Sequence, residues 1–322
     1  MSDHDELMTY LTNSRLCALP QSASEMIELS KDPSNGPKEY AEPISADMGL
    51  ASQVLRFVNS SFFGFRFKIT SVPMALTLVS VRTVRNFVLW NGLFAILPNP
   101  RFGPFSTKKL FLDSLRRAVF ARTVAKLYTP IDGDEAFFCA MLQDIAIPIL
   151  AQKWKSEYTA MIHQSTTRQV RLSTLEREKM NWDHSIAGGI LAIGWNLGDT
   201  VANGIVKHTD TVIVSPTGLP SLDDIVVLSA LLPKMRDENW HEAKTFVEVF
   251  HRMFGAKLTD LNSIFSNTDT DTDKLAALIN LGRIPKKLSD YWQEKLDQFP
   301  GNETEDVSAF EEALEEYFIT VC

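Results

Sequence analysis

Cysteine is scarce in this chain of 322 residues, with three copies at Cys17, Cys139 and Cys322. Their number is odd, they are widely spaced, and none of the intervals is the paired spacing of a cysteine metal site. These features exclude a disulfide framework and a cysteine-rich zinc site. They are typical of a protein from a reducing compartment, and we expect the cytoplasm.

A long hydrophobic run is also missing. The longest apolar stretch, from Phe87 to Leu97, is interrupted by Asn91 and Gly92 and is far too short to cross a bilayer. The acidic start, MSDHDE, has no basic segment followed by an apolar one, so we predict no signal peptide and no membrane partner. With 45% apolar and 22% charged residues, the composition predicts a globular protein that buries a sizeable core.

The sequence has no sustained two-residue alternation with hairpin turns, which argues against a β-rich fold. The run TVIVS at residues 211–215 is the only short segment that resembles a strand. Elsewhere the apolar residues recur at helical spacing, most clearly between residues 106 and 128, and the prediction is an all-α fold of many short helices. The segment NTDTDTDKLAAL, residues 267–278, imitates a calcium loop but lacks its glycine and glutamate. We predict a plain loop there, with Asp273 capping the next helix.

Two long motifs carry a family resemblance. They are PISADMGLASQVLRFVNSSFFG at residues 43–64 and DHSIAGGILAIGWNLGDTVANGIVKH at residues 183–208. Together they resemble the HDOD domain, the HD-related output domain of bacterial signalling proteins. The resemblance implies a multi-helix HD-like bundle over residues 17–212. We expect an N-terminal helix in residues 1–16 and a helical C-terminal extension in residues 213–322 that packs on the HDOD core.

The parent HD superfamily hydrolyses phosphate esters at a metal site made of histidines and aspartates, and the resemblance implies where that site would lie. Its first histidine falls on Asp113, its His-Asp pair on Gln143 and Asp144, and two later histidines on His184 and His208. A neutral amide oxygen binds a transition metal far more weakly than an imidazole does. We therefore predict a degenerate metal site with no catalytic residue and no cofactor.

The alternative is a working ion site with an unusual ligand set. Asp113, Asp144, His184 and His208 could together hold one iron, manganese or zinc ion, because two carboxylates and two imidazoles are an acceptable set. Each residue also has a purely structural interpretation. The histidines stand at predicted helix ends, and a buried Asp144 needs only a partner such as Arg117.

Charge is unevenly distributed along the chain. The formal net charge is −8, yet residues 66–126 are strongly basic. The arginines of this segment could form a surface for an anionic partner or a small phosphate-bearing ligand: Arg82, Arg85, Arg116, Arg117 and Arg122. The competing interpretation is a set of solvated helix faces. The negative net charge and the lack of a known reader motif argue against nucleic acid.

The C-terminal residues predict an acidic amphipathic helix. Glutamates fill one side of residues 303–322, and apolar residues recur on the other. This helix is either a last piece of core or a partner-binding element. For the whole chain we expect a non-enzymatic bacterial signal-transduction module that contacts other signalling proteins. The alternative is a metal-dependent phosphohydrolase acting on a phosphodiester or nucleotide.

Overall fold

The computed structural model describes residues 3–13, 19–103, 105–210, 219–255 and 258–296. All regular structure in these ranges is helical, so the prediction of an all-α fold is confirmed. The segment 211–215 and the acidic tail 303–322 lie outside the described residues. Among the described helices, no single one combines the length and the apolar composition needed to cross a bilayer. Two consecutive helices, Val72–Val79 and Val81–Ile96, reach this length and composition only when they are taken together, and the chain is sharply bent between them.

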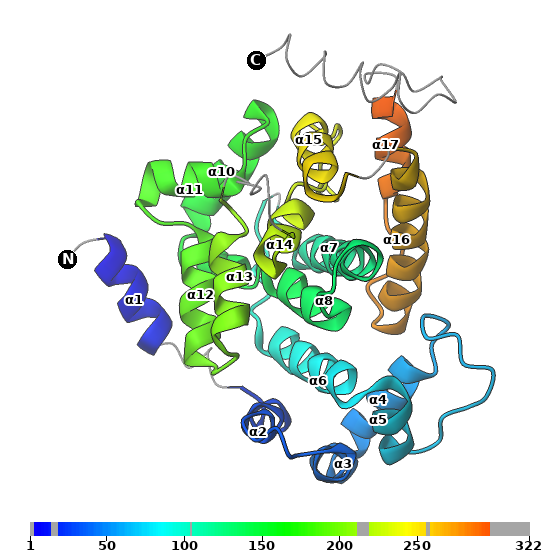
Figure 1. Ribbon diagram of the computed structural model, residues 1–322. Helices are drawn as coiled ribbons and strands as arrows, with labels where there is room; N and C mark the ends of the chain where they lie inside the picture. The colour runs from blue at the N-terminus through cyan, green and yellow to red at the C-terminus, as the bar shows by residue number, and fades with distance from the viewer. Residues whose placement is uncertain (1–2, 14–18, 104, 211–218, 256–257, 297–322) are drawn as a thin grey trace.

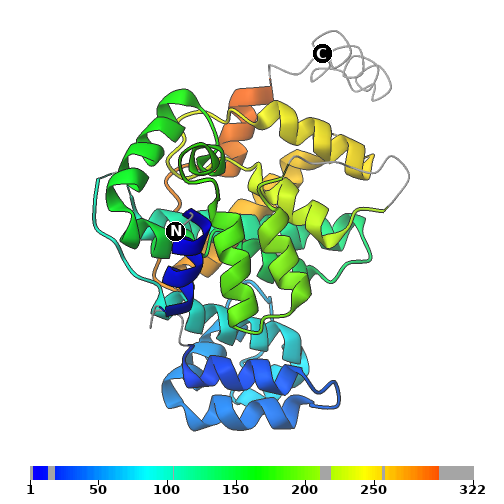
Figure 2. The ribbon, with the colours of Figure 1, turned by 90° about the vertical axis from the view of Figure 1, so that its left-hand side faces the viewer.

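Six short helices form the N-terminal part of the chain, and five of them lie together at the bottom of the molecule (Figures 1 and 2). Helix starts here follow ordinary capping rules, since the Asp47 side chain accepts the Leu50 amide and Ser71 accepts the Met74 amide. The side chain of Asn59 bonds both backbone groups of Ile69 and so closes the loop before α5. The helices are α1 (Asp3–Asn13), α2 (Gln21–Ser30), α3 (Pro37–Ala46), α4 (Met48–Val58), α5 (Val72–Val79) and α6 (Val81–Ile96).

Helix α7 (Thr107–Tyr128) runs through the middle of the molecule (Figure 1). Ser106 caps its first turn by accepting the Lys109 amide. The sequence pattern predicts an amphipathic helix with Arg116 and Arg117 on its polar face, but both arginines are buried. The prediction is wrong there because helices that follow α7 in the chain pack against it, so its polar face also becomes interior.

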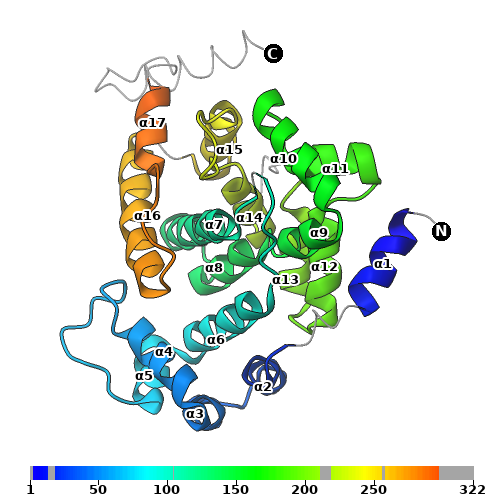
Figure 3. The same cartoon turned by 180° about the vertical axis from the view of Figure 1, so that it is seen from behind.

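The helices after α7 build the upper half of the molecule, with α9 beside α12 in the reverse view (Figure 3). Helix α8 packs closely along α7, and α12 packs against α13. They are α8 (Gly133–Leu142), α9 (Ile147–Lys153), α10 (Lys155–Arg168), α11 (Leu172–Met180), α12 (His184–Gly194) and α13 (Asp199–Lys207).

The C-terminal helices form a second core on the other side of α7. Their interior is aromatic, with Phe120 of α7 in contact with Phe246 and Phe265, and with Trp240 and Trp292 packed around them. These aromatic contacts bind the extension to α7. The helices are α14 (Leu222–Ala230), α15 (Ala243–Phe254), α16 (Leu258–Leu278) and α17 (Leu288–Leu296).

The loop predicted at residues 267–278 is in fact the second half of α16. Its polar side chains support the helix and its neighbour: buried Thr272 bonds the Thr268 carbonyl, and Asp269 accepts the amides of Leu288 and Ser289 at the start of α17. The prediction failed because aspartates and threonines usually cap or turn the chain next to themselves. Here Asp269 lies inside one helix and caps another, α17, about twenty residues later.

We expect Phe246→Ala to lower the free energy of unfolding by about 3–5 kcal/mol, because it removes a fully buried ring from the second core. Urea denaturation followed by circular dichroism measures the change. Phe67→Ala is the matched control, since the Phe67 side chain is 53% exposed and its removal should change stability by less than about 0.5 kcal/mol. Equal effects of the two substitutions would contradict a C-terminal core built around Phe246.

Candidate functional site

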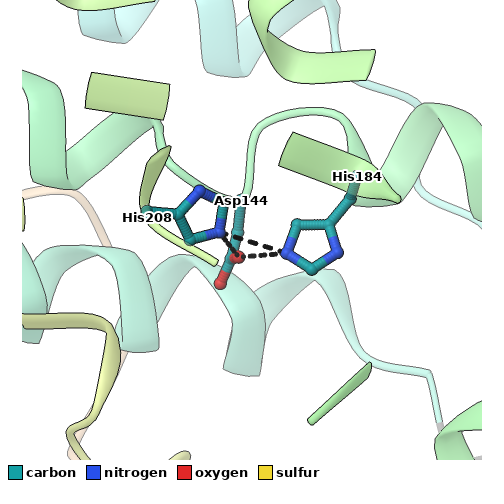
Figure 4. Close-up of side chains that lie close together, drawn as sticks. All are labelled: Asp144, His184 and His208. Atoms are coloured by element: carbon teal, nitrogen blue, oxygen red, sulfur yellow. Dashed lines mark hydrogen bonds and ion pairs between the residues drawn. The ribbon is translucent and has the colours of Figure 1, made fainter. Parts of the chain in front are cut away.

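Three of the predicted site residues converge in the interior (Figure 4). Asp144 lies in the turn between α8 and α9, His184 begins α12, and His208 directly follows α13. Asp183 caps α12 by accepting the amides of Ser185 and Ile186, which fixes the position of His184. All three converging side chains are buried.

A glycine brings the two histidine-bearing helices together. A side chain placed at Gly188 would approach Ile205 of α13 to 2.7 Å, too close for any real Cβ contact. The absence of a side chain lets α12 and α13 pack closely, and the start of α12 then lies opposite the end of α13. Close helix packing therefore sets the distance between His184 and His208.

The three polar atoms that meet form a nearly equilateral triangle. The Nε2 of His184 lies 3.2 Å from Oδ1 of Asp144, and the Nε2 of His208 lies 3.4 Å from the same oxygen. The two Nε2 atoms are 3.2 Å apart. Ligands about 2.1 Å from a tetrahedral ion are separated by about 3.4 Å, so the triangle matches one face of such an ion's coordination shell.

The opposite nitrogen of each imidazole is already held by an acceptor. Nδ1 of His184 lies 2.5 Å from Oε2 of Glu176, and Nδ1 of His208 lies 2.6 Å from the Ile205 carbonyl oxygen. Each Nδ1 therefore carries a proton, and in a neutral ring the Nε2 lone pair faces the triangle. This arrangement of outer partners is the one that orients histidines toward a metal.

The triangle consequently needs a cation. Two Nε2 lone pairs and a carboxylate oxygen would otherwise face one another with no proton between them. A metal ion would satisfy all three groups, and one additional proton on a histidine would satisfy them in part. The donor set of two imidazoles and one carboxylate suits iron, manganese or zinc, and the residues present fit such an ion.

The surrounding charges favour the proton on His184. Burial alone would lower the pKa of His184, but Glu176 and Asp144 outweigh it and raise the pKa to about 10. Burial lowers the pKa of His208, and the charge of His184 lowers it further. Burial opposes ionisation of Asp144, yet Arg117 and the two histidines hold its pKa well below the usual range.

Glu176 is the residue that the sequence did not predict. It is fully buried, accepts the Tyr158 hydroxyl at 2.5 Å, and accepts the His184 amide at 3.0 Å. Its partners stand 18 and 8 residues away along the chain, so no local motif identifies it. The only signal is a glutamate on the apolar side of α11, one turn before that helix ends.

Asp113 does not belong to the triangle, so three of the four predicted ligands converge. Its Oδ1 accepts the Met235 amide at 2.6 Å. Burial raises the pKa of Asp113 to about 6, against the opposing effect of Arg117 and Arg116. Arg117 takes the other oxygen of Asp144 in a buried ion pair, which confirms the expectation that a buried Asp144 has such a partner.

The Gln143 side chain also forms its hydrogen bonds outside the triangle. Its side-chain amide donates to the Ala140 carbonyl at 2.8 Å and to the Ser229 hydroxyl of α14 at 3.4 Å. Its buried Oε1 has no hydrogen-bond partner among the described residues. At the position where the superfamily has a histidine, this chain therefore has a side chain that ties α8 to α14.

The five arginines of the predicted anionic-partner surface do not share one exposed face, which corrects that prediction. Arg116 is completely buried and donates to the carbonyls of Pro233 and Lys286, while Arg117 is the buried partner of Asp144. Both are inside because the C-terminal helices cover α7.

The other three arginines each have a partner among the described residues. Arg82 is 46% exposed and pairs with Asp132 at 2.9 Å. Arg85 bonds the neighbouring Asn86, and Arg122 pairs with Asp134 at 2.8 Å. Each has a partner within its own part of the fold, so only Arg82 keeps a largely accessible charge.

We expect stability to fall as pH rises above about 6.5 in protein freed of metal. A histidine with a raised pKa binds its proton more tightly in the folded state, so this stabilisation is complete below the unfolded pKa of 6.5 and is lost toward the folded pKa of about 10. The slope from one such proton is about −1.4 kcal/mol per pH unit. Glu176→Gln should remove most of this slope.

Urea unfolding between pH 6.5 and 9.5 measures the slope. Glu178→Gln is the matched control, because Glu178 stands two residues away on α11 and is paired only with Arg168 on the surface. A slope that is the same in both variants would show that Glu176 does not hold the His184 proton.

Solved structures of similar fold come from three bacteria. A candidate signal-transduction protein from Marinobacter aquaeolei VT8 has a TM-score of 0.66 at 18% identity, with 87% of this chain and 65% of that chain covered. An HDOD domain protein of unknown function from Geobacter sulfurreducens has a TM-score of 0.65 at 17% identity, with 87% and 99% covered. A candidate phosphohydrolase from Shewanella amazonensis SB2B has a TM-score of 0.63 at 17% identity, with 84% and 98% covered.

Sequence comparison agrees with this fold. An uncharacterised protein of Treponema pallidum (strain Nichols) is 23% identical over 202 residues, which are 60% of this chain. The chain covers only 38% of that relative's length. The sequence profile of the HDOD domain matches residues 16–211, which include Asp144, His184 and His208. The chain therefore belongs to the HDOD family.

Proposed function

We propose that this protein is a non-enzymatic signal-transduction module that acts through contacts with other signalling proteins. The observation that carries the proposal is the ion pair between Arg117 and Asp144, at the centre of the former hydrolase site. Arg117 takes the carboxylate oxygen that does not face the histidines. A second ion on that oxygen would have to displace a buried positive charge.

The space beside the triangle supports the same conclusion. The cavity lined by Arg117, His184 and His208 has a volume of about 20 Å³. This volume holds about one water-sized group. Hydrolysis of a phosphate ester needs an activated water and the ester together at the ion, and this small volume is unfavourable for such an arrangement.

The triangle itself has a role in this proposal. Asp144, His184 and His208 would hold one ion, and Glu176 and the Ile205 carbonyl would orient the two imidazoles. Such an ion acts as a Lewis acid and lowers the pKa of a bound water. In this chain we assign its net effect to cross-linking α12, α13 and the α8–α9 turn, since the cavity beside the ion is small.

The second candidate is a metal-dependent phosphohydrolase. The triangle favours it, because three protein ligands with one further position is the pattern of catalytic rather than structural zinc sites. The likeness to the Shewanella candidate phosphohydrolase is consistent with either function, since an identity of 17% carries the fold alone. We propose a bacterial cytoplasm as the setting, because every relative named above is bacterial.

Metal analysis combined with phosphodiesterase assays separates the two candidates. We expect at most one ion per chain, lost in Asp144→Ala, and no turnover of bis(p-nitrophenyl) phosphate or cyclic nucleotides above the level of that variant. Asp210→Ala is the matched control, because Asp210 is exposed and only two residues from His208. Turnover that survives in Asp210→Ala and disappears in Asp144→Ala would establish the hydrolase and overturn our proposal.

A further inference from the structure

A second cavity, of about 50 Å³, shares Asp144, Leu172 and Lys234 with the cavity beside the triangle. Its walls come from the start of α7, from α9, α10 and α11, and from the linker between α14 and α15. The apolar part of the lining includes Phe105, Leu110 and Ile162. The polar part consists of Ser106, Lys109, Asp113, Asp144, Lys234 and Arg236.

The three cations of this lining have no counter-ion. Within the described residues, Lys109, Lys234 and Arg236 form no ion pair, although thirteen ion pairs of other lysines and arginines are present there. Arg236 bonds only the neutral hydroxyl of Ser165, at 3.4 Å. Lys109 is exposed, whereas Lys234 and Arg236 are half-buried. Two half-buried positive charges without an ion-pair partner on one small cavity are an electrostatic cost that a bound anion would reduce.

The two carboxylates of the lining do not balance these charges, because each is already engaged. Asp144 is paired with Arg117, and Asp113 accepts the Met235 amide. With Asp144 neutralised by Arg117, three cations face the single remaining carboxylate, Asp113, and leave an excess of positive charge. The cavity is therefore suited to an anion.

Lys234 is the central residue of this site. It lines both cavities and is partly buried between them. Burial lowers the pKa of Lys234, and the neighbouring charges of Arg236 and Arg117 lower it further. A bound anion would offset each of these effects and complete the hydrogen bonding of the ammonium group.

The volume limits the size of the bound group. A space of about 50 Å³ is larger than the cavity beside the triangle and suits a small polyatomic anion. We propose that this cavity binds a phosphate group, either inorganic phosphate or the phosphoryl end of a phosphomonoester, through Lys109, Lys234 and Arg236. A nucleoside or other large substituent would lie outside the cavity.

Two of the three cations belong to the C-terminal extension. Lys234 and Arg236 lie beyond residues 16–211, the part that matches the HDOD domain, whereas Lys109 lies within it. A phosphate would thus join the HDOD domain to this chain's own extension. The inference rests on the proposed function in one respect, namely that the anion is a regulatory ligand and not a reaction product.

Isothermal titration calorimetry at constant ionic strength tests the proposal, with inorganic phosphate, AMP and adenosine as separate titrants. We expect saturable binding of phosphate, of AMP, or of both, and none of adenosine. Tighter binding of AMP would identify a phosphomonoester as the ligand, and binding of phosphate alone would identify the free ion. Absence of binding by both phosphate compounds would overturn the proposal.

Charge-removing variants locate the bound group. Lys109→Ala and Lys234→Met should each weaken binding at least about tenfold, because each removes a charge-assisted hydrogen bond. Lys108→Ala is the matched control, since Lys108 is the neighbour of Lys109, is exposed as Lys109 is, and lines a different cavity. It should bind as the unaltered protein does. Equal binding by Lys108→Ala and Lys109→Ala would overturn the site, and this pair remains informative if Lys234→Met does not fold.

The two proposals fail separately. Ester turnover by a protein that binds phosphate would overturn the non-enzymatic function. It would not contradict the anion site, whose phosphate would then be the product of the reaction. Loss of phosphate binding with no turnover would leave the non-enzymatic function standing and remove its ligand.

Discussion

The structure depends on keeping a row of charges inside the protein. Arg117, Asp144, His184 and Glu176 follow one another through the interior with alternating sign, and His208 closes the row against Asp144. Four different helices and one turn supply these groups. A charge left alone in the interior would be very costly, so each element is needed to neutralise the next. This requirement fixes how α7, α11, α12 and α13 meet.

The C-terminal extension buries the polar face of the central helix, α7. In a shorter bundle α7 would have a polar face toward water, as its sequence pattern suggests. Here the aromatic core around Phe246 covers that face, and Arg116 becomes a wholly buried link to the carbonyls of Pro233 and Lys286. The extension therefore reaches the cavity beside the His-Asp triangle, through the linker that carries Lys234.

The sequence was sufficient for the fold and for part of the site. Helical spacing and caps predicted the all-α architecture, and the family motifs located Asp144, His184 and His208, which do converge. It failed where an outcome depends on distant partners. Asp113 and Arg116 have the same local pattern whether α7 faces water or another helix, and Glu176 has no motif. The aspartates of residues 267–278 predict a loop from sequence alone, because the role of Asp269 as the cap of α17 depends on a distant segment.

Lys234 forms part of the wall of both cavities, and this sharing has a thermodynamic consequence. A cation in the His-Asp triangle and an anion beside Lys234 would lie within a few side chains of each other in a medium of low polarity, where opposite charges attract strongly. Each would then raise the affinity of the other by the same factor, as linkage requires. Such a pair of sites would be filled together most readily when the cation and the anion are both present, so the protein would respond to the combination of the two ligands.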